Sequence, residues 1–205
     1  MEGHKMFSEV EMTRDVAICS KDLKSQSPPH HQILSRLLED LMCESASKEH
    51  GFHLGITAVK SIGNNKNKND DDHHQKQVLT FPVSFTCRTF MPVEGDVLQG
   101  VVYKVYSNGA FIRPGPLRHA YLPAVKMPAY RYFPAGSEEE KACFRREDLT
   151  KIAAGVVVRF KVLAVRFVES RPHEKGNDVH VLVTLEDDDD TLGPISLAGP
   201  DDPYM

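Results

Sequence analysis

The chain has 205 residues, of which 40% are hydrophobic and 26% charged, and its formal net charge is −4. This composition excludes a disordered chain and predicts one large or two small globular domains. No run approaches the roughly 18 apolar residues of a membrane span, and the N-terminal residues lack the apolar core of a secretory signal. We therefore expect an intracellular protein that is not embedded in a membrane.

The four cysteines are scattered singly and show no Cys-x-x-Cys spacing. This pattern favours buried free thiols over a zinc site or a disulfide framework. The residues concerned are Cys19, Cys43, Cys87 and Cys143.

A strand and a helix are predicted first. Loose apolar alternation over Phe7–Ile18 predicts a strand with an irregular centre, and Leu23 is expected to add a contact after it. Ser27-Pro28-Pro29 predicts a helix start, because serine caps helices and proline fits the first turn. The helix should end near Ser45, and its apolar stripe, which either covers a sheet or receives a partner helix, consists of Ile33, Leu34, Leu37, Leu38, Leu41 and Met42.

Two more strands complete the first half of the chain. They are predicted over Phe52–Ile62 and Val78–Phe90, separated by residues 63–77, which contain no apolar side chain and indicate a solvated, disordered hairpin loop. His73 and His74 in this loop are not expected to bind a metal, because a flexible loop fixes no ligand geometry. An antiparallel sheet with one covering helix is therefore expected.

A tight hairpin is predicted after Gly95. Ser107-Asn108-Gly109 has the composition of a two-residue turn, and the strand after it should place Ala110 and Ile112 on one face and Phe111 and Arg113 on the other. The strand before it is expected to have one buried face, formed by Val97, Val101, Tyr103 and Val105.

Three further strands follow. Pro114-Gly115-Pro116 predicts a turn into a third strand through Tyr121. The aromatic residues of the 126–144 insertion are expected to pack on the barrel or on a partner. A fourth strand is predicted from Ile152 to Val168, and a charged tip at 169–178 should lead to a fifth strand over Val179–Thr184 with both faces at least half buried.

The pattern Gly95-Asp96-Val97, Gly100, Val102 and then Asn108-Gly-Ala-Phe-Ile112 resembles an S1 domain, a five-stranded barrel of the OB type. Over a longer span, from Met6 to Ile195, the chain resembles the stalk subunit of multisubunit RNA polymerases, which is subunit seven in eukaryotes and has an E-type counterpart in archaea. Met127-Pro128 and the run from Asp189 to Ile195 strengthen this resemblance. The resemblance implies an α+β protein: an RNP-like sheet with a covering helix in residues 1–92, an S1/OB-like five-stranded barrel in 93–198, and a tail in 199–205.

The resemblance also implies partners. Members of that family dock on the polymerase core through the first domain, pair with a small helical subunit (subunit four in eukaryotes), and hold the S1 domain near nascent single-stranded RNA in the nucleus. The mildly acidic chain suits a tethered module, because attachment raises the local RNA concentration. Divergent loops favour a specialised paralogue, and the plant polymerases IV and V of RNA-directed DNA methylation and gene silencing are our hypothesis.

Candidate RNA-binding residues lie on or just after the first three barrel strands, where rings can stack on bases and cations can pair with phosphates. They are Lys104, Phe111, Arg113, Arg118, His119, Tyr121 and Lys126. The alternative is that the two rings pack within the fold and the cations only solubilise the barrel. A second basic set, interpreted as a solvated face, comprises Arg159, Lys161 and Arg166.

Candidate polymerase-docking residues are taken from the resemblance alone and lie in the hairpin of the first half. They are Gly55, Ile62, Gly63, Phe81, Phe85 and Arg88. The two glycines have the alternative role of relieving turns.

Catalysis finds no support in the sequence. The acidic run Asp187–Asp190 does not converge on a magnesium ion, and no nucleophile, base and acid occur in a recognisable arrangement. We expect no cofactor, no metal and no enzyme activity of the isolated chain. The alternative function is a free-standing S1-domain RNA-binding factor of translation or RNA decay.

Overall fold

A computed structural model of the chain describes residues 6–20, 29–44, 46–65, 78–136, 141–169, 178–186 and 191–195. The chain divides into two compact units between Met91 and Pro92. Several predicted features lie outside the described residues. They are Leu23, the Ser27-Pro28 helix start, Ser45, most of the 63–77 loop with its two histidines, most of the 169–178 tip, the acidic run 187–190 and the tail.

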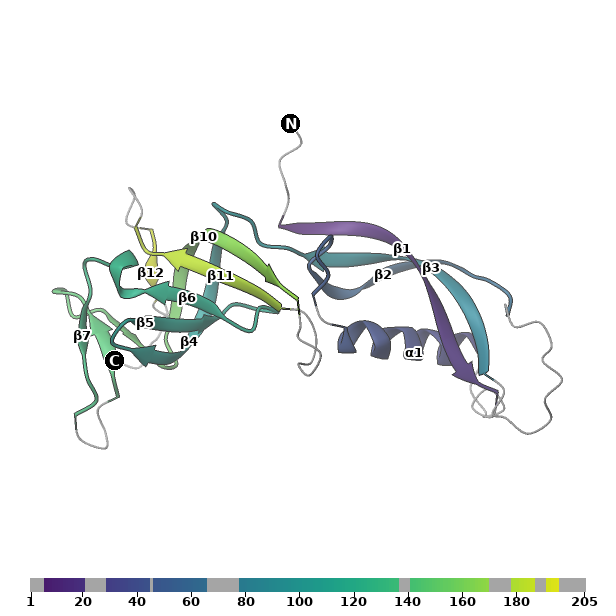
Figure 1. Ribbon diagram of the computed structural model, residues 1–205, viewed down its shortest axis with the longest axis horizontal. Helices are drawn as coiled ribbons and strands as arrows, with labels where there is room; N and C mark the ends of the chain where they lie inside the picture. The colour runs from purple at the N-terminus through teal and green to yellow at the C-terminus, as the bar shows by residue number, and fades with distance from the viewer. Residues whose placement is uncertain are drawn as a thin grey trace, which may run out of the picture. The chain divides into compact units, whose positions relative to one another are not determined.

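The first unit is a three-stranded antiparallel sheet with one helix (Figure 1). Its elements are β1 (Phe7–Cys19), α1 (Pro29–Cys43), β2 (Phe52–Ile62) and β3 (Val78–Phe90), and the sheet order is β1-β3-β2. Helix α1 packs on one face of this sheet through β1 and β2. The predicted sheet with one covering helix is confirmed.

The irregular centre predicted for β1 is wrong. All thirteen residues of β1 pair with β3 in one unbroken register, and the irregularities lie in β2 instead, at three register shifts after His53. The gap in the apolar pattern is Arg14, which occupies a helix-facing position between Met12 and Val16. Its guanidinium lies 2.8 Å from the carboxylate of Glu44, so the polar residue is accommodated without disturbing the strand.

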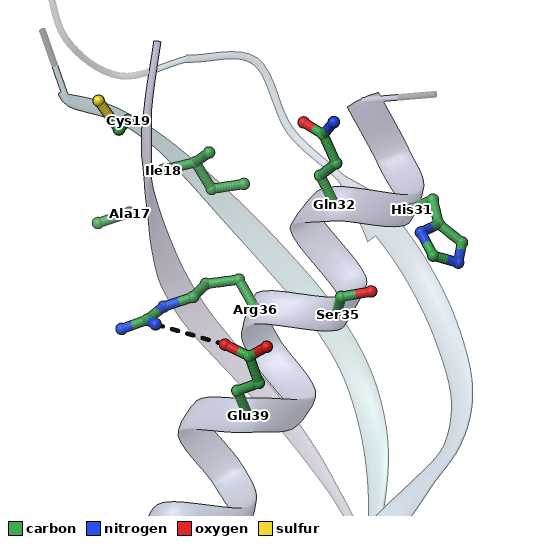
Figure 2. Close-up of a pocket in the computed structure, with 8 residues that line it drawn as sticks. All are labelled: Ala17, Ile18, Cys19, His31, Gln32, Ser35, Arg36 and Glu39. Carbon is green, nitrogen blue, oxygen red and sulfur yellow. Dashed lines mark hydrogen bonds and ion pairs between the residues drawn. The ribbon is translucent and has the colours of Figure 1, made fainter. Parts of the chain in front are cut away.

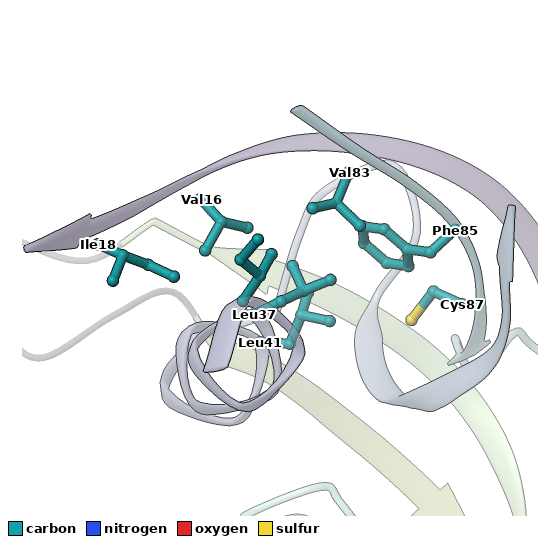
Figure 3. Close-up of a cluster of buried hydrophobic side chains, with 8 residues drawn as sticks. Val16, Ile18, Leu37, Leu41, Val83, Phe85 and Cys87 are labelled. Carbon is teal, nitrogen blue, oxygen red and sulfur yellow. The ribbon is translucent and has the colours of Figure 1, made fainter. Parts of the chain in front are cut away.

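The core of the first unit lies between the helix and the sheet (Figure 3). Residues spaced by four on α1 project onto the sheet, because i and i+4 share one face of a helix. The buried residues are Val16, Ile18, Ile33, Leu37, Leu41, Val83, Phe85 and Cys87. Of the other three residues of the predicted stripe, Leu34 packs partly against this core, whereas Leu38 and Met42 are exposed.

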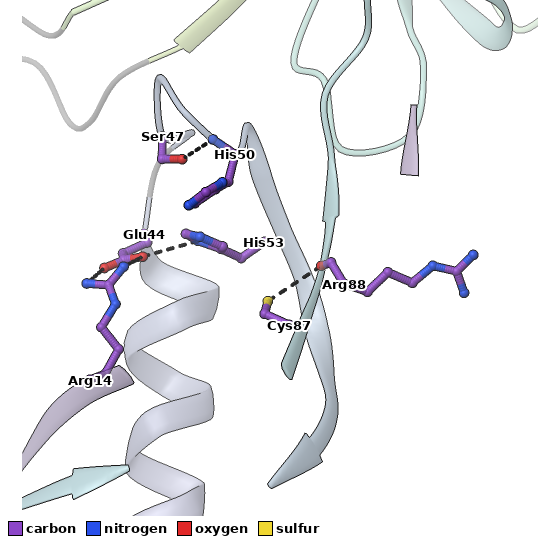
Figure 4. Close-up of polar contacts among 7 residues, drawn as sticks. All are labelled: Arg14, Glu44, Ser47, His50, His53, Cys87 and Arg88. Atoms are coloured by element: carbon purple, nitrogen blue, oxygen red, sulfur yellow. Dashed lines mark hydrogen bonds and ion pairs between the residues drawn. The ribbon is translucent and has the colours of Figure 1, made fainter. Parts of the chain in front are cut away.

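A polar network joins the C-terminal end of α1 to β1 and β2 (Figure 4). Glu44 pairs with Arg14, and its Oε2 lies 3.2 Å from Nδ1 of His53, although these two atoms are not aligned for a hydrogen bond. The side chain of His53 is only 2% exposed. Burial lowers the pKa of His53; Glu44 opposes this effect, while Arg14 and His50 add to it.

The cysteines are all free, but the prediction that they are buried is wrong for most of them. Cys87 is fully buried, and burial raises the pKa of its thiol. Cys19 and Cys143 are half-buried, and Cys43 is exposed because it falls on the outer side of the last turn of α1.

The second unit contains a closed five-stranded barrel, as predicted. Strand β4 pairs with β5, β5 with β6, β6 in parallel with β11, β11 with β10, and β10 with β4. The strands are β4 (Val97–Tyr106), β5 (Gly109–Arg113), β6 (Ala120–Pro123), β10 (Val157–Val168) and β11 (Asp178–Thr184). A short strand, β12 (Gly193–Pro194), adds to β10, and a one-turn 3-10 helix, η2 (Ala124–Lys126), follows β6.

Between β6 and β10 the chain forms a second, smaller antiparallel sheet. Its strands are β7 (Arg131–Phe133), β8 (Cys143–Arg145) and β9 (Lys151–Ala153). Tyr132 stacks on the buried Phe144 with ring centroids 5.4 Å apart, so part of the aromatic content of this insertion packs within the unit.

The predicted inward face of β4 is largely wrong. Leu98, Gly100 and Val102 are buried, whereas Val97 and Val101 are exposed. Gly100 occupies an interior position where a Cβ would lie 2.7 Å from Ile112 Cγ2 and 2.8 Å from Arg113 O. This position therefore requires glycine, which leaves no apolar signal in the sequence.

On β5 and β11, buried and exposed residues are separated more clearly than on β4. On β5, Ala110 and Ile112 are buried while Phe111 and Arg113 lie outside, as predicted. On β11 the prediction of two half-buried faces is wrong, because His180 and Leu182 are exposed between buried valines.

Replacing Gly100 with alanine is expected to destabilise the barrel by about 1–3 kcal/mol, because the backbone oxygen of Arg113 must move to admit the methyl group. Amide hydrogen exchange of β4 and β5 measures this loss directly. Gly55→Ala is the control, since nothing lies within 4 Å of its added Cβ, and it should change stability by less than about 0.5 kcal/mol. Equal exchange rates of the β4 and β5 amides in the two variants would contradict the conclusion that position 100 requires glycine.

Lowering the pH is expected to destabilise the first unit through His53. Its pKa is lowered from 6.5 in the folded chain, so the unfolded chain binds a proton first as the pH falls. The neutral histidine thus contributes stability above about pH 6.5 that is lost as the pH approaches the lower folded pKa. Urea unfolding at several pH values measures this slope, and His53→Gln should flatten it. Parallel profiles for the variant and the unmodified chain would refute the role of His53.

Candidate nucleic-acid interface

The outer face of the barrel carries a cluster of aromatic rings centred on Phe111. Its ring centroid lies 5.0 Å from that of Tyr121, 6.0 Å from Tyr106 and 6.2 Å from Tyr103. Phe111, Tyr103 and Tyr121 are half-buried and Tyr106 is exposed, so the cluster keeps accessible ring surface. We call these four residues the ring cluster.

Strand register brings the ring cluster together. Tyr121 of β6 stands directly opposite Phe111 of β5, and Lys104 of β4 stands opposite Phe111 on the other side. A β-bulge between Val102 and Lys104 inserts Tyr103 as an extra residue, and a bulge re-aims side chains. Tyr103 keeps the outward direction of Val101, and the shift after it brings Lys104 and Tyr106 to the outer face as well.

Polar and charged groups border the ring cluster. The guanidinium carbon of Arg113 lies 4.9 Å from the ring centroid of Tyr103, a cation–π contact. Tyr103 Oη and His119 Nδ1 are 2.8 Å apart, and the His119 ring lies 6.4 Å from that of His180 on β11. Arg166 stands opposite His180, so cations continue along this side of the barrel.

The β4–β5 turn fixes the position of Tyr121. Its hydroxyl donates a hydrogen bond of 2.9 Å to the carbonyl oxygen of Asn108. A Cβ at Gly109 would lie 2.4 Å from Leu122 O and 2.9 Å from the ring of Tyr121. The Asn-Gly pair therefore makes the turn and also admits the tyrosine ring beside it.

The predicted RNA-binding residues fall into two groups. Phe111 and Tyr121 belong to the ring cluster. Three exposed side chains adjoin the cluster, namely Lys104, Arg113 and His119. Arg118 is exposed in the loop before β6. Lys126 lies on η2, where its Nζ is 2.9 Å from Glu186 Oε2. In the second basic set, Arg159 and Arg166 are exposed and Lys161 is half-buried.

Sequence reasoning missed Tyr103, Tyr106 and His180. Tyr103 was assigned to the interior together with Val97, Val101 and Val105, because valines occur on both faces of β4 and do not show which face is buried. Tyr106 could have been found, since a residue just before an Asn-Gly turn lies opposite the start of the next strand. His180 could have been found from simple alternation with the buried Val179 and Val181.

The predicted docking residues differ in how much of their surface is exposed. Phe85 has no exposed surface, so its role in this fold is core packing, and Ile62 and Phe81 pack partly against the same core. Gly63 donates its N–H to Pro82 O at 2.8 Å and so continues the pairing of β2 with β3 by one residue. Gly55 is half-exposed, and no atom lies within 4 Å of the place where a Cβ would be added to it. Arg88 is exposed, and its guanidinium carbon lies 5.4 Å from the ring centroid of Phe7.

A hollow of about 560 Å³ lies between the end of β1 and the start of α1 (Figure 2). Arg36 on its rim pairs with Glu39 and Asp40 along the helix, so its charge is balanced locally. Among the residues that the structure describes, no group of three histidine, cysteine or acidic side chains could hold a metal ion. Within the same residues, no helix combines the length and apolarity needed to cross a membrane.

Comparison with known proteins gives three near full-length matches in Arabidopsis thaliana. A protein named DNA-directed RNA polymerase subunit 7-like is 64% identical over 203 residues, covering 98% of this chain and 100% of that protein. Subunit 7 of DNA-directed RNA polymerase V is 32% identical, covering 93% of this chain and 99% of that protein. Subunit 7 of polymerase IV is also 32% identical, with 92% and 99% covered. No family model matches the chain.

Proposed function

The chain belongs to the subunit 7 family of DNA-directed RNA polymerases, and we propose that it acts there as a non-catalytic subunit whose barrel contacts nascent RNA. The ring cluster bordered by Arg113 and Lys104 carries this proposal. Exposed rings beside cations suit single-stranded RNA, since bases stack on rings and phosphates pair with cations.

Stacking supplies sequence-tolerant affinity of roughly 1–3 kcal/mol per base. The net charge of −4 predicts weak RNA binding by the free chain, because affinity for the backbone depends on neutralised phosphates. Attachment to a transcribing enzyme compensates for this weakness by raising the effective RNA concentration. The remaining candidates Arg118, His119 and Lys126 would extend the contact along the strand.

We further propose that the first unit docks on the core polymerase and that the chain pairs with a small helical subunit in the nucleus. Arg88 and Gly55 are the docking candidates that remain accessible. The exposed Leu38 and Met42 on α1 offer an apolar surface that suits a helical partner.

The enzyme we favour is one of the plant polymerases of RNA-directed DNA methylation and gene silencing. Two relatives whose names place them in polymerases V and IV match over more than nine-tenths of this chain, which supports a specialised polymerase.

Copurification tests the subunit assignment. The tagged chain, expressed in its own cells, should be recovered in equal amounts with a large polymerase subunit and a small helical protein, as identified by mass spectrometry. Recovery with ribosomes or nucleases would instead favour a free-standing RNA-binding factor and would overturn the proposal.

Crosslinking tests the RNA contact. Replacing Phe111 and Arg113 with alanine should reduce ultraviolet crosslinking of the assembled polymerase to its transcript several-fold, because one stacking surface and one phosphate partner are lost. Tyr121→Phe keeps the ring, so crosslinking should persist although the hydrogen bond to Asn108 is removed. Lys48→Ala is the matched charge control, since this exposed cation lies in the first unit, between α1 and β2. Equal crosslinking in all variants would place the RNA elsewhere.

A further inference from the structure

Three cations stand directly opposite one another across the small β7–β8–β9 sheet. Arg131 pairs in register with Arg145, and Arg145 with Lys151. Directly opposite residues share a sheet face, and the alternate face carries the packed row that includes Tyr132, Phe144 and Ile152. We call Arg131, Arg145 and Lys151 the cation row.

The cation row lowers the stability of the small sheet when no ligand is bound. Like charges directly opposite on neighbouring strands destabilise a sheet. Within the described part of the chain, no carboxylate forms an ion pair with any of the three. An anionic ligand would remove this repulsion.

A hollow of about 560 Å³ adjoins the cation row. Arg131 and Arg145 line it together with Arg146 and Glu147, and its apolar lining consists of Pro128, Ala129, Phe133 and Leu149. The guanidinium carbon of Arg145 lies 4.1 Å from the Phe133 ring centroid, and this stacking holds the N–H groups of the arginine in place.

Leu149 at the rim of the hollow adopts an unusual conformation. Its φ is +71°, in the left-handed region that is costly for a side chain with a Cβ, and 71% of its surface is exposed. The turn is fixed by hydrogen bonds from Arg146 N to Thr150 O and from Thr150 N to Asp148 Oδ1. The fold thus holds a large apolar side chain in solvent beside the cations.

We propose that this face of the small sheet binds an acidic, partly apolar peptide segment of a partner protein. Carboxylates of the peptide would pair with the cation row, and an apolar side chain would cover Leu149 and Phe133. Arginine and exposed apolar side chains together are typical of protein interfaces. This proposal concerns a different sheet from the ring cluster and is independent of the RNA contact.

The lining favours a peptide over single-stranded RNA. One face of the Phe133 ring is already covered by Arg145, so little stacking surface remains for a base. Glu147 lines the hollow and can accept a hydrogen bond from a peptide N–H, whereas a phosphodiester has no hydrogen to donate to it. Burial of Leu149 contributes only with a ligand that has apolar groups.

A fluorescent twelve-residue peptide of alternating acidic residues and leucines is the probe, and its binding to the full chain is measured by anisotropy. We expect saturable binding that weakens as salt rises, and weaker binding of a matched peptide with serine in place of leucine. Arg131→Ala with Lys151→Ala should weaken binding about tenfold, as truncation of interface hot spots does. The matched control, Arg159→Ala with Arg166→Ala, removes two exposed cations from β10 and should change affinity little.

Two single variants separate binding from folding. Leu149→Gly suits a positive φ, so it should keep or raise the midpoint of thermal unfolding while weakening peptide binding about threefold. Lys151→Glu places a carboxylate opposite Arg145, so it should raise the unfolding midpoint and weaken binding.

Three results would overturn the proposal. One is the absence of saturable peptide binding at millimolar concentration. Another is equal loss of affinity in the two double variants, which would mean that only net charge matters. The third is tighter binding of a dodecauridylate that displaces the peptide, which would make this face a nucleic-acid surface.

Discussion

The bulge between Val102 and Lys104 is the constraint on which the aromatic face of the barrel depends. Up to Val102, the even-numbered residues of β4 point inward. Tyr103 points outward like Val101, and the extra residue then reverses the alternation, so Lys104 and Tyr106 also point outward while Val105 pairs with the buried Ala110. A shift of one residue moves every later side chain to the other face. Without the bulge, Lys104 and Tyr106 would point into the barrel, and Phe111 would lose its contact with the Tyr106 ring and the lysine opposite it.

The sequence therefore predicts where strands form better than it predicts which side of a strand is buried. The Asn108-Gly109 turn and the pairing of its two strands follow from local chemistry, because few residues accept that backbone geometry. The face of β4 does not, since valines occur on both sides and the interior position of Gly100 carries no hydrophobic signal. The bulge itself arises from the fit between two strands, which no local pattern records.

Contacts between distant residues limit prediction in the first unit as well. Arg14 looks like an interruption of β1 until Glu44, at the end of α1, is seen to pair with it. His53 on β2 is the buried member of this polar group, whose other two side chains come from β1 and from the residue that follows α1. Apolar periodicity correctly predicts the helix and the three strands, whereas these polar positions depend on how the elements pack.

Net charge is a poor guide to where this chain meets anions. The exposed side of β1 carries Glu9, Glu11 and Asp15, whereas β4–β6 and the small β7–β9 sheet expose cations. Screening limits charge effects in solution to about 8 Å, so each surface interacts mainly through its own nearby charges. Residues 92–205 contain 17 acidic and 14 basic residues, so the second unit contributes most of the net charge of −4, and its basic faces are local features that the net value does not reveal.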